Sequence, residues 1–147
     1  MKYPFNGFRP KELQILAQYV FIYEQSIRPM KQKVEFEKQF ISASLFFKQN
    51  LTPYIKLKEA EEMRELNPLS KTNENNLYIR KSKLCILLSF CRELRNSICH
   101  ALIHKKGKWV LIENFYKGKS PCRGTILFSN LRLFIEQTIK FKPAKEY

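Results

Sequence analysis

Residues 95–100, with the sequence RNSICH, combine side-chain types that suit cleavage of a phosphodiester. Cleaving RNA without a metal requires a base for the 2′-hydroxyl, an acid for the departing 5′-oxygen and positive charge beside the phosphorus. Histidine titrates near neutral pH, so His100 can give or accept a proton. Arg95 keeps its positive charge and can form paired hydrogen bonds to phosphate oxygens. The two side chains together predict phosphodiester chemistry at this stretch.

These residues belong to the longest stretch of helical periodicity in the chain, residues 77–104, which we predict to be one helix. At about 100° per residue, Arg95 falls inside the apolar stripe of this helix. Asn96, His100 and His104 form a separate polar strip. A buried, unpaired guanidinium is costly, so Arg95 must meet an anion or lie at the boundary of the apolar face. The anion is either a glutamate of another helix or a substrate phosphate, bound where two copies of the helix share an active site.

The charge of the chain favours a polyanionic partner. Its 147 residues carry 27 basic and 13 acidic side chains, a net charge of +14. Residues 1–79 contribute 12 basic and 9 acidic side chains, whereas residues 80–147 contribute 15 and 4, a net +11. Nucleic acid is the polyanion that fits such a surface best. Solubility together with a lysine-biased genome is the alternative explanation.

Several classes of protein are not expected from the composition. All acidic residues are glutamates, which argues against a two-metal site built from clustered short carboxylates. The four cysteines show no CxxC pair, so we predict neither a zinc site nor a disulfide, and no cofactor. No apolar run reaches the roughly 18 residues of a membrane span, and the N-terminus lacks the apolar core of a signal peptide. We therefore expect a cytosolic protein.

Local patterns predict one domain over residues 1–147, all-α apart from a small β-hairpin late in the chain. Helical spacing of apolar residues, with proline near several helix starts, predicts helices on both sides of a polar loop. The predicted helices span residues 9–29, 30–51, 52–66, 77–104 and 129–141. The loop spans residues 67–76, the hairpin joins stretches 107–116 and 124–129, and the tail spans residues 142–147. Four phenylalanines at helical spacing are expected in the core: Phe36, Phe40, Phe46 and Phe47.

A basic segment follows the predicted long helix and is a candidate RNA-binding surface. It combines positive charges that can contact phosphates with one aromatic ring that can stack on a base. The candidate RNA-binding residues are His104, Lys105, Lys106, Lys108, Trp109, Lys117, Lys119 and Arg123. The alternative is a solvated turn with Trp109 in the core. For His104 the alternative is a favourable interaction with the C-terminal dipole of the helix.

The form RNxxxH, with Arg95, Asn96 and His100 near the end of a late helix, resembles the motif of HEPN (higher eukaryotes and prokaryotes nucleotide-binding) ribonucleases. The resemblance covers residues 77–104 well and the two N-terminal helices loosely. It implies an up-and-down helical bundle with a hairpin elaboration. It also implies that Arg95 and His100 are the catalytic pair and that Asn96 is the supporting polar residue.

The same resemblance implies a metal-independent endoribonuclease that acts as a homodimer with a composite active site and leaves 2′,3′-cyclic phosphate ends. Such enzymes serve in phage defence, in toxin–antitoxin pairs and in CRISPR-associated systems. The implied partners are RNA, a second copy of the chain and an antitoxin or other defence protein. Two alternatives stay open: a non-catalytic helical RNA-binding or adaptor module, and a helical protein-interaction subunit paired with a nucleotidyltransferase-type antitoxin.

Overall fold

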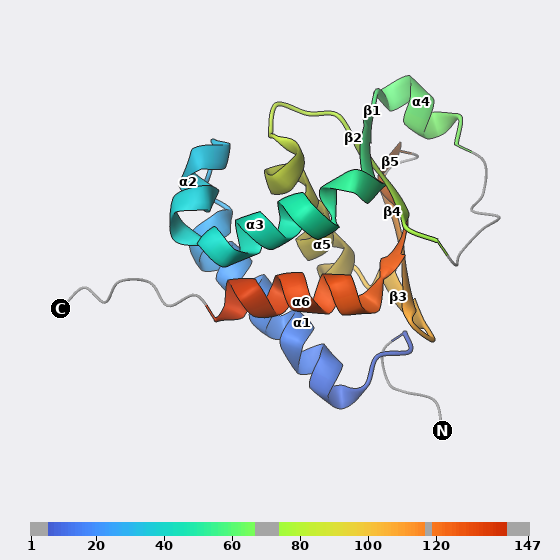
Figure 1. Cartoon of the computed structure of the whole chain (residues 1–147). Helices are drawn as coiled ribbons and strands as arrows, with labels where there is room; N and C mark the ends of the chain where they lie inside the picture. The colour runs from blue at the N-terminus through green and yellow to red at the C-terminus, as the bar shows by residue number, and fades with distance from the viewer. Residues whose placement is uncertain (1–5, 67–73, 117–118, 141–147) are drawn as a thin grey trace.

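A five-stranded sheet forms the centre of the fold, and most of the helices lie against one of its faces (Figure 1). The structure, a computed structural model, describes residues 6–66, 74–116 and 119–140. The strands are β1 (Ile55–Lys58), β2 (Asn76–Arg80), β3 (Ile103–Lys106), β4 (Trp109–Tyr116) and β5 (Lys119–Leu127). Their order in the sheet is β1-β2-β5-β4-β3. The predicted all-α bundle is therefore wrong, because the chain folds as a mixed α/β structure.

The helices come before, between and after the strands. They are α1 (Pro10–Ile22), α2 (Lys33–Gln39), α3 (Ile41–Asn50), α4 (Ala60–Arg64), α5 (Ile86–Cys99) and α6 (Phe128–Ile139). A π-helical turn, η1 (Tyr23–Ile27), extends α1, and a 3₁₀ turn, η2 (Thr52–Tyr54), leads into β1. The helices predicted over residues 9–29 and 129–141 are confirmed. The helix predicted over residues 30–51 is divided into α2 and α3 at Phe40, whose backbone leaves the helical region (φ −120°, ψ 61°).

The long helix predicted over residues 77–104 is wrong at both ends. Its first residues form β2, whose apolar side chains Leu77 and Ile79 are buried while their neighbours are half-buried, as in a strand. Helix α5 begins only after Cys85, whose sulfur accepts a hydrogen bond from the backbone N–H of Leu88. Strand β2 pairs in parallel with β1, which precedes it in the chain, and antiparallel with β5.

Helix α5 ends at Cys99 because the chain turns into a left-handed residue. Ala101 has φ 55°, a conformation that usually favours glycine. The backbone N–H groups of Ala101 and Leu102 donate to the carbonyls of Ile98 and Ser97, at 3.3 and 2.8 Å. This pair of bonds is a Schellman cap. His100 is therefore the C-cap residue, immediately after the last helical residue, and the chain continues from there into β3.

Strand β3 pairs with β4 through a two-residue turn that begins with Gly107, at φ 59°. The predicted hairpin of residues 107–116 and 124–129 is confirmed as β4 and β5, while the helix predicted over residues 52–66 is wrong. That segment contains η2, β1 and the short helix α4. Most of the predicted loop and the predicted tail lie outside the described residues.

Aromatic side chains from several helices join the helical layer to the sheet. Phe47 of α3, Phe90 of α5 and Phe134 of α6 are buried, with ring centroids 5.4–5.7 Å apart. Phe36 and Phe40 stack on one another at 4.8 Å and are also buried, so their predicted place in the core is confirmed. The remaining phenylalanine of the predicted set, Phe46, is partly buried against this cluster. Among the described residues, no helix combines the length and apolar character needed to cross a lipid bilayer.

Candidate functional site

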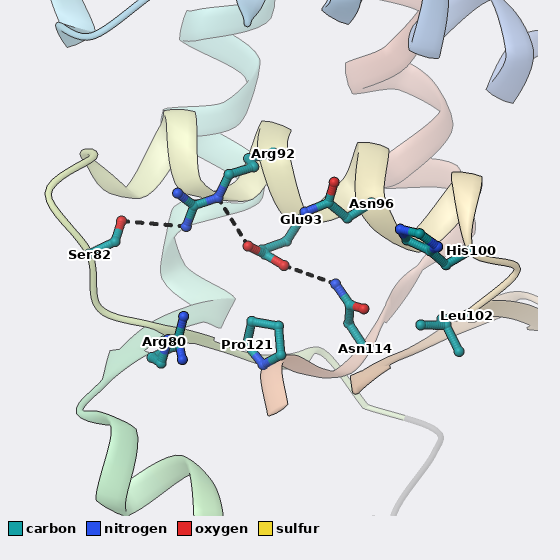
Figure 2. Close-up of a pocket in the computed structure, with 9 residues that line it drawn as sticks. All are labelled: Arg80, Ser82, Arg92, Glu93, Asn96, His100, Leu102, Asn114 and Pro121. Atoms are coloured by element: carbon teal, nitrogen blue, oxygen red, sulfur yellow. Dashed lines mark hydrogen bonds and ion pairs between the residues drawn. The ribbon is translucent and has the colours of Figure 1, made fainter. Parts of the chain in front are cut away.

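A polar cleft of about 460 Å³ lies between α5 and the ends of the central strands (Figure 2). Its size is typical of a small-molecule binding site. It is lined by Arg80, Ser82, Arg92, Glu93, Asn96, His100, Leu102, Asn114 and Pro121. The cleft contains two of the three predicted catalytic residues, Asn96 and His100.

Helix periodicity explains why α5 forms one wall of the cleft. Glu93, Asn96 and His100 are three and four residues apart, so they lie along one side of the helix. Their side chains follow one another along the upper wall in Figure 2. Because the Schellman cap ends the helix at this point, His100 lies at the mouth of the cleft and is exposed.

A hydrogen-bonded carboxylate lies on the α5 wall of the cleft. Glu93 is only 3% exposed, and its two oxygens accept from different partners. One accepts from the side-chain amide of Asn114 on β4 at 2.9 Å, and the other from Nε of Arg92 at 3.1 Å. Arg92 also reaches Oγ of Ser82, at 3.5 Å. A buried carboxylate needs such partners, and this network connects α5 to the sheet and to the loop before α5.

Arg95 lies on a different side of α5 and does not line the cleft. Its Nε donates to the carboxylate of Glu24 in η1 at 2.6 Å, which is the glutamate pairing that the sequence left open. Arg28 donates to the same carboxylate at 2.7 Å. The hydrogen bond from Arg28, opposed by desolvation and aided by Arg95, lowers the pKa of Glu24. Arg95 keeps 26% of its side chain exposed, so it is partnered at the surface rather than enclosed in the core.

A second hydrogen bond connects Arg95 to the cleft. Its NH1 group donates to Oδ1 of Asn96 at 3.1 Å. Because the amide oxygen of Asn96 accepts from Arg95, its NH₂ group is the part that can donate to a ligand in the cleft. Within one chain, Arg95 therefore positions Asn96, and the series Glu24–Arg95–Asn96 connects η1 to the cleft wall.

The structure divides the predicted RNA-binding residues into two groups. His104, Lys106 and Lys108 are exposed, and Nζ of Lys108 lies 5.9 Å from the ring centroid of Trp109. Trp109 pairs with Lys106 across the hairpin, so the two side chains share a face of the sheet. We call these four residues the hairpin surface. Side chains alternate along β4, so Trp109 and the cleft residue Asn114 lie on opposite faces of the sheet.

The other predicted RNA-binding residues have structural partners or are not described. Nζ of Lys105 lies 2.9 and 3.2 Å from the carboxylate oxygens of Glu12, and both side chains are almost buried. Arg123 is also buried, and its NH1 group donates to the carbonyl of Leu66. Lys117 lies outside the described residues. Of Lys119, only the backbone within β5 is described.

Seven of the nine cleft residues were missed by the sequence prediction. Four of them carry a charged or amide side chain: Arg80, Arg92, Glu93 and Asn114. Glu93 and His100 are seven residues apart, which places them on the same side of a helix and indicates the α5 wall of the cleft. Nothing local could place Arg80 and Asn114 beside them, because the pairing of β2, β5 and β4 brings these residues together. Within the described residues, no group of three or more His, Cys or Glu side chains could hold a metal ion.

Comparison of the chain with family models, curated proteins and solved structures finds no match.

Proposed function

We propose that this protein is a metal-independent endoribonuclease in which His100 transfers a proton at a phosphodiester bound at the mouth of the cleft. One observation carries the proposal: an exposed histidine shares a cleft with the amide of Asn96 and with two arginines, Arg80 and Arg92. Histidine moves protons near neutral pH, and an amide donor beside it can stabilise charge on phosphate oxygens. The guanidinium groups, at the other end of the cleft, can bind a neighbouring phosphate of the same strand. The net +11 of residues 80–147 favours a polyanionic substrate.

The proposed reaction is an internal transfer of the phosphoryl group. The 2′-oxygen of the ribose loses its proton to a base and attacks the adjacent phosphorus. The bond from phosphorus to the 5′-oxygen then breaks, and that oxygen takes a proton from an acid. The products are a 2′,3′-cyclic phosphate and a free 5′-hydroxyl. Water is not consumed, so no activated water is required.

The reaction needs an acid and a base, and one cleft holds a single histidine. The other histidine, His104, is on the hairpin surface and does not line the cleft. We therefore propose a homodimer in which a second copy of His100 completes the site. The RNxxxH resemblance to HEPN ribonucleases supports this proposal, whereas the all-α fold that it implied is wrong. The dimer would also give Arg95, partly exposed and paired with Glu24, access to a phosphate held between the copies.

Cleavage of a mixed-sequence RNA in excess EDTA tests the proposal. We expect cleavage to continue in the chelator and the fragments to end in 2′,3′-cyclic phosphates. A strict requirement for Mg²⁺, or fragments with 5′-phosphates, would show that a different mechanism operates.

A non-catalytic RNA-binding module is a second candidate, favoured by the hairpin surface. Lys106 and Lys108 are exposed beside the ring of Trp109, which combines phosphate contacts with a stacking group. This function predicts RNA binding with a steep salt dependence and no cleavage, insensitive to substitution of His100. The four free cysteines, all among the described residues, suit a reducing compartment, so we propose that either function operates in the cytosol.

A further inference from the structure

We propose that the cleft binds one nucleotide of a single-stranded RNA, with its 5′-phosphate at the Arg80–Arg92 end and its base at the Asn114 end. The phosphodiester proposed to react beside His100 is then a different one, on the 3′ side of this nucleotide. This inference rests on the proposed function only in taking RNA as the ligand. It assigns the substrate class and the recognition residues of the cleft, and it does not require cleavage. In Figure 2 the two arginines and Ser82 lie at one end of the cleft, while His100 and Leu102 lie at the other.

The first end carries more positive than negative charge. Arg92 is paired with Glu93 at 3.1 Å, which balances one of the two guanidinium groups. Arg80 has no carboxylate within 4 Å among the described residues, so its charge is not balanced within the cleft. Arginine forms paired hydrogen bonds with phosphate oxygens, and the hydroxyl of Ser82 can donate a further one. An anionic group of the ligand is therefore expected at this end.

The second end presents an accessible acceptor atom, on an otherwise buried side chain, to the cleft. Asn114 is 4% exposed, and its NH₂ group is used by Glu93. Among the described residues its oxygen Oδ1 has no hydrogen-bond partner. Figure 2 shows this oxygen directed away from Glu93, towards the end of the cleft with His100. This oxygen is not among the buried atoms that lack a partner, so it is accessible from the cleft. It can accept from a donor of solvent or ligand, and the N–H groups of a nucleobase are such donors.

The surroundings of Asn114 suit a flat, partly polar ring. Asn96 offers its NH₂ group, because Arg95 holds its oxygen. Leu102 and Pro121 supply apolar walls. A base edge carries donors beside acceptors, so it can bond to the Asn114 oxygen and to the Asn96 NH₂ group together. An inorganic anion would use the arginine end and leave the Asn114 oxygen unpaired.

The test uses the full chain carrying His100→Ala, which separates binding from cleavage. The probes are the four nucleoside 5′-monophosphates and inorganic phosphate, with affinities measured by calorimetry. We expect Arg80→Ala to weaken both kinds of probe at least tenfold. Asn114→Ser should weaken the mononucleotides and reduce the differences between bases, without changing phosphate binding. Serine keeps a hydroxyl donor for Glu93, so this variant is designed to fold, and its unfolding temperature is measured in parallel.

The matched control is Arg132→Ala, because Arg132 is paired with Glu136 on α6 as Arg92 is paired with Glu93, but outside the cleft. It should bind every probe as the parent does. The inference is overturned if the folded His100→Ala chain binds no mononucleotide. It is also overturned if adding Arg80→Ala or Asn114→Ser to that chain leaves mononucleotide affinity unchanged. Nucleotide binding together with intact RNA in the cleavage assay would reject the nuclease proposal and support the nucleotide site.

Discussion

At the scale of single residues, Arg95 shows how far helical spacing could predict the site. Spacing placed Arg95 and His100 on different sides of one helix, and the structure has Arg95 on Glu24 and His100 in the cleft. The sequence could not choose between a glutamate and a phosphate as the partner of Arg95. That choice depends on where the end of α1 packs against α5, which is a tertiary feature.

Lys105 is the residue whose prediction changes most. Its place among lysines next to Trp109 predicts contact with RNA. In the structure, however, side chains alternate along β3, and that of Lys105 points to the helical side. There its Nζ lies 2.9 Å from Glu12 and 4.7 Å from the ring centroid of Phe128. Glu12 also accepts from the backbone N–H of Arg9, so this pair ties the start of α1 to β3.

The Glu12 carboxylate predicts a dependence of stability on pH. Burial raises its pKa, but the hydrogen bonds from Arg9 and Lys105 outweigh this, and its pKa lies below the usual 4.5. Because the pKa of Glu12 is lower in the folded state, its ionised form stabilises the fold at pH values above the usual glutamate pKa. This stabilisation is lost as the pH falls through the folded-state pKa. We expect the unfolding temperature of the parent to fall more steeply than that of Glu12→Gln between about pH 5 and pH 3.

Glu37→Gln, which alters an exposed glutamate of α2, is the control for this pH series and should follow the parent. Parallel curves for the parent and Glu12→Gln would show that Glu12 does not contribute in this way.

At the scale of elements, the errors have physical causes that can be named. The segment before α5 has neither proline nor glycine between Leu77 and Cys85, so nothing local marks the change from strand to helix. In contrast, the alternation of Ile55 and Leu57 with lysines was a signal for β1 that the predicted helix over 52–66 overlooked. Strands β1 and β2 become stable only by pairing with each other and with β5, which helical periodicity cannot predict.

The cap of α5 gives a prediction about stability. Ala101 adopts φ 55°, where an L-residue with a Cβ is strained by about 1 kcal/mol. Glycine removes that strain, although it also increases the entropy of the unfolded chain. We expect Ala101→Gly to raise the free energy of unfolding by about 0.5–1 kcal/mol in urea titrations.

Ala60→Gly, at the first position of α4, is the control for this variant. It increases the entropy of the unfolded chain by the same amount, but it relieves no backbone strain in the folded state. It should leave the protein less stable or unchanged. Destabilisation by Ala101→Gly would mean that the Schellman cap does not hold the helix end as described.

At the scale of the whole molecule, the proposed dimer requires a surface beside Arg95. Helix α1 exposes 60% of Phe21, three residues before Glu24, and thus presents a large apolar side chain that a second copy would cover. We expect Phe21→Glu to lower the solution mass, measured by light scattering, from that of a dimer to that of a monomer. RNA cleavage should fall with it.

Ile41 is the matched control, because it is 63% exposed on α3 and equally apolar. Ile41→Glu should leave both mass and cleavage unchanged. A parent that is monomeric while cleaving RNA would rule out the composite site and confine the chemistry to one cleft.

The central claim is that His100 performs proton transfer in the cleft, and the chain contains its own control. His104 is the other histidine, exposed on the hairpin surface and outside the cleft. Cleavage of mixed-sequence RNA in EDTA should fall by about a hundredfold or more in His100→Ala, the usual contribution of a proton-transfer residue. His104→Ala should cleave at close to the parental rate. If His100→Ala, folded and of parental mass, cleaves RNA as fast as the parent, the assignment of His100 is wrong.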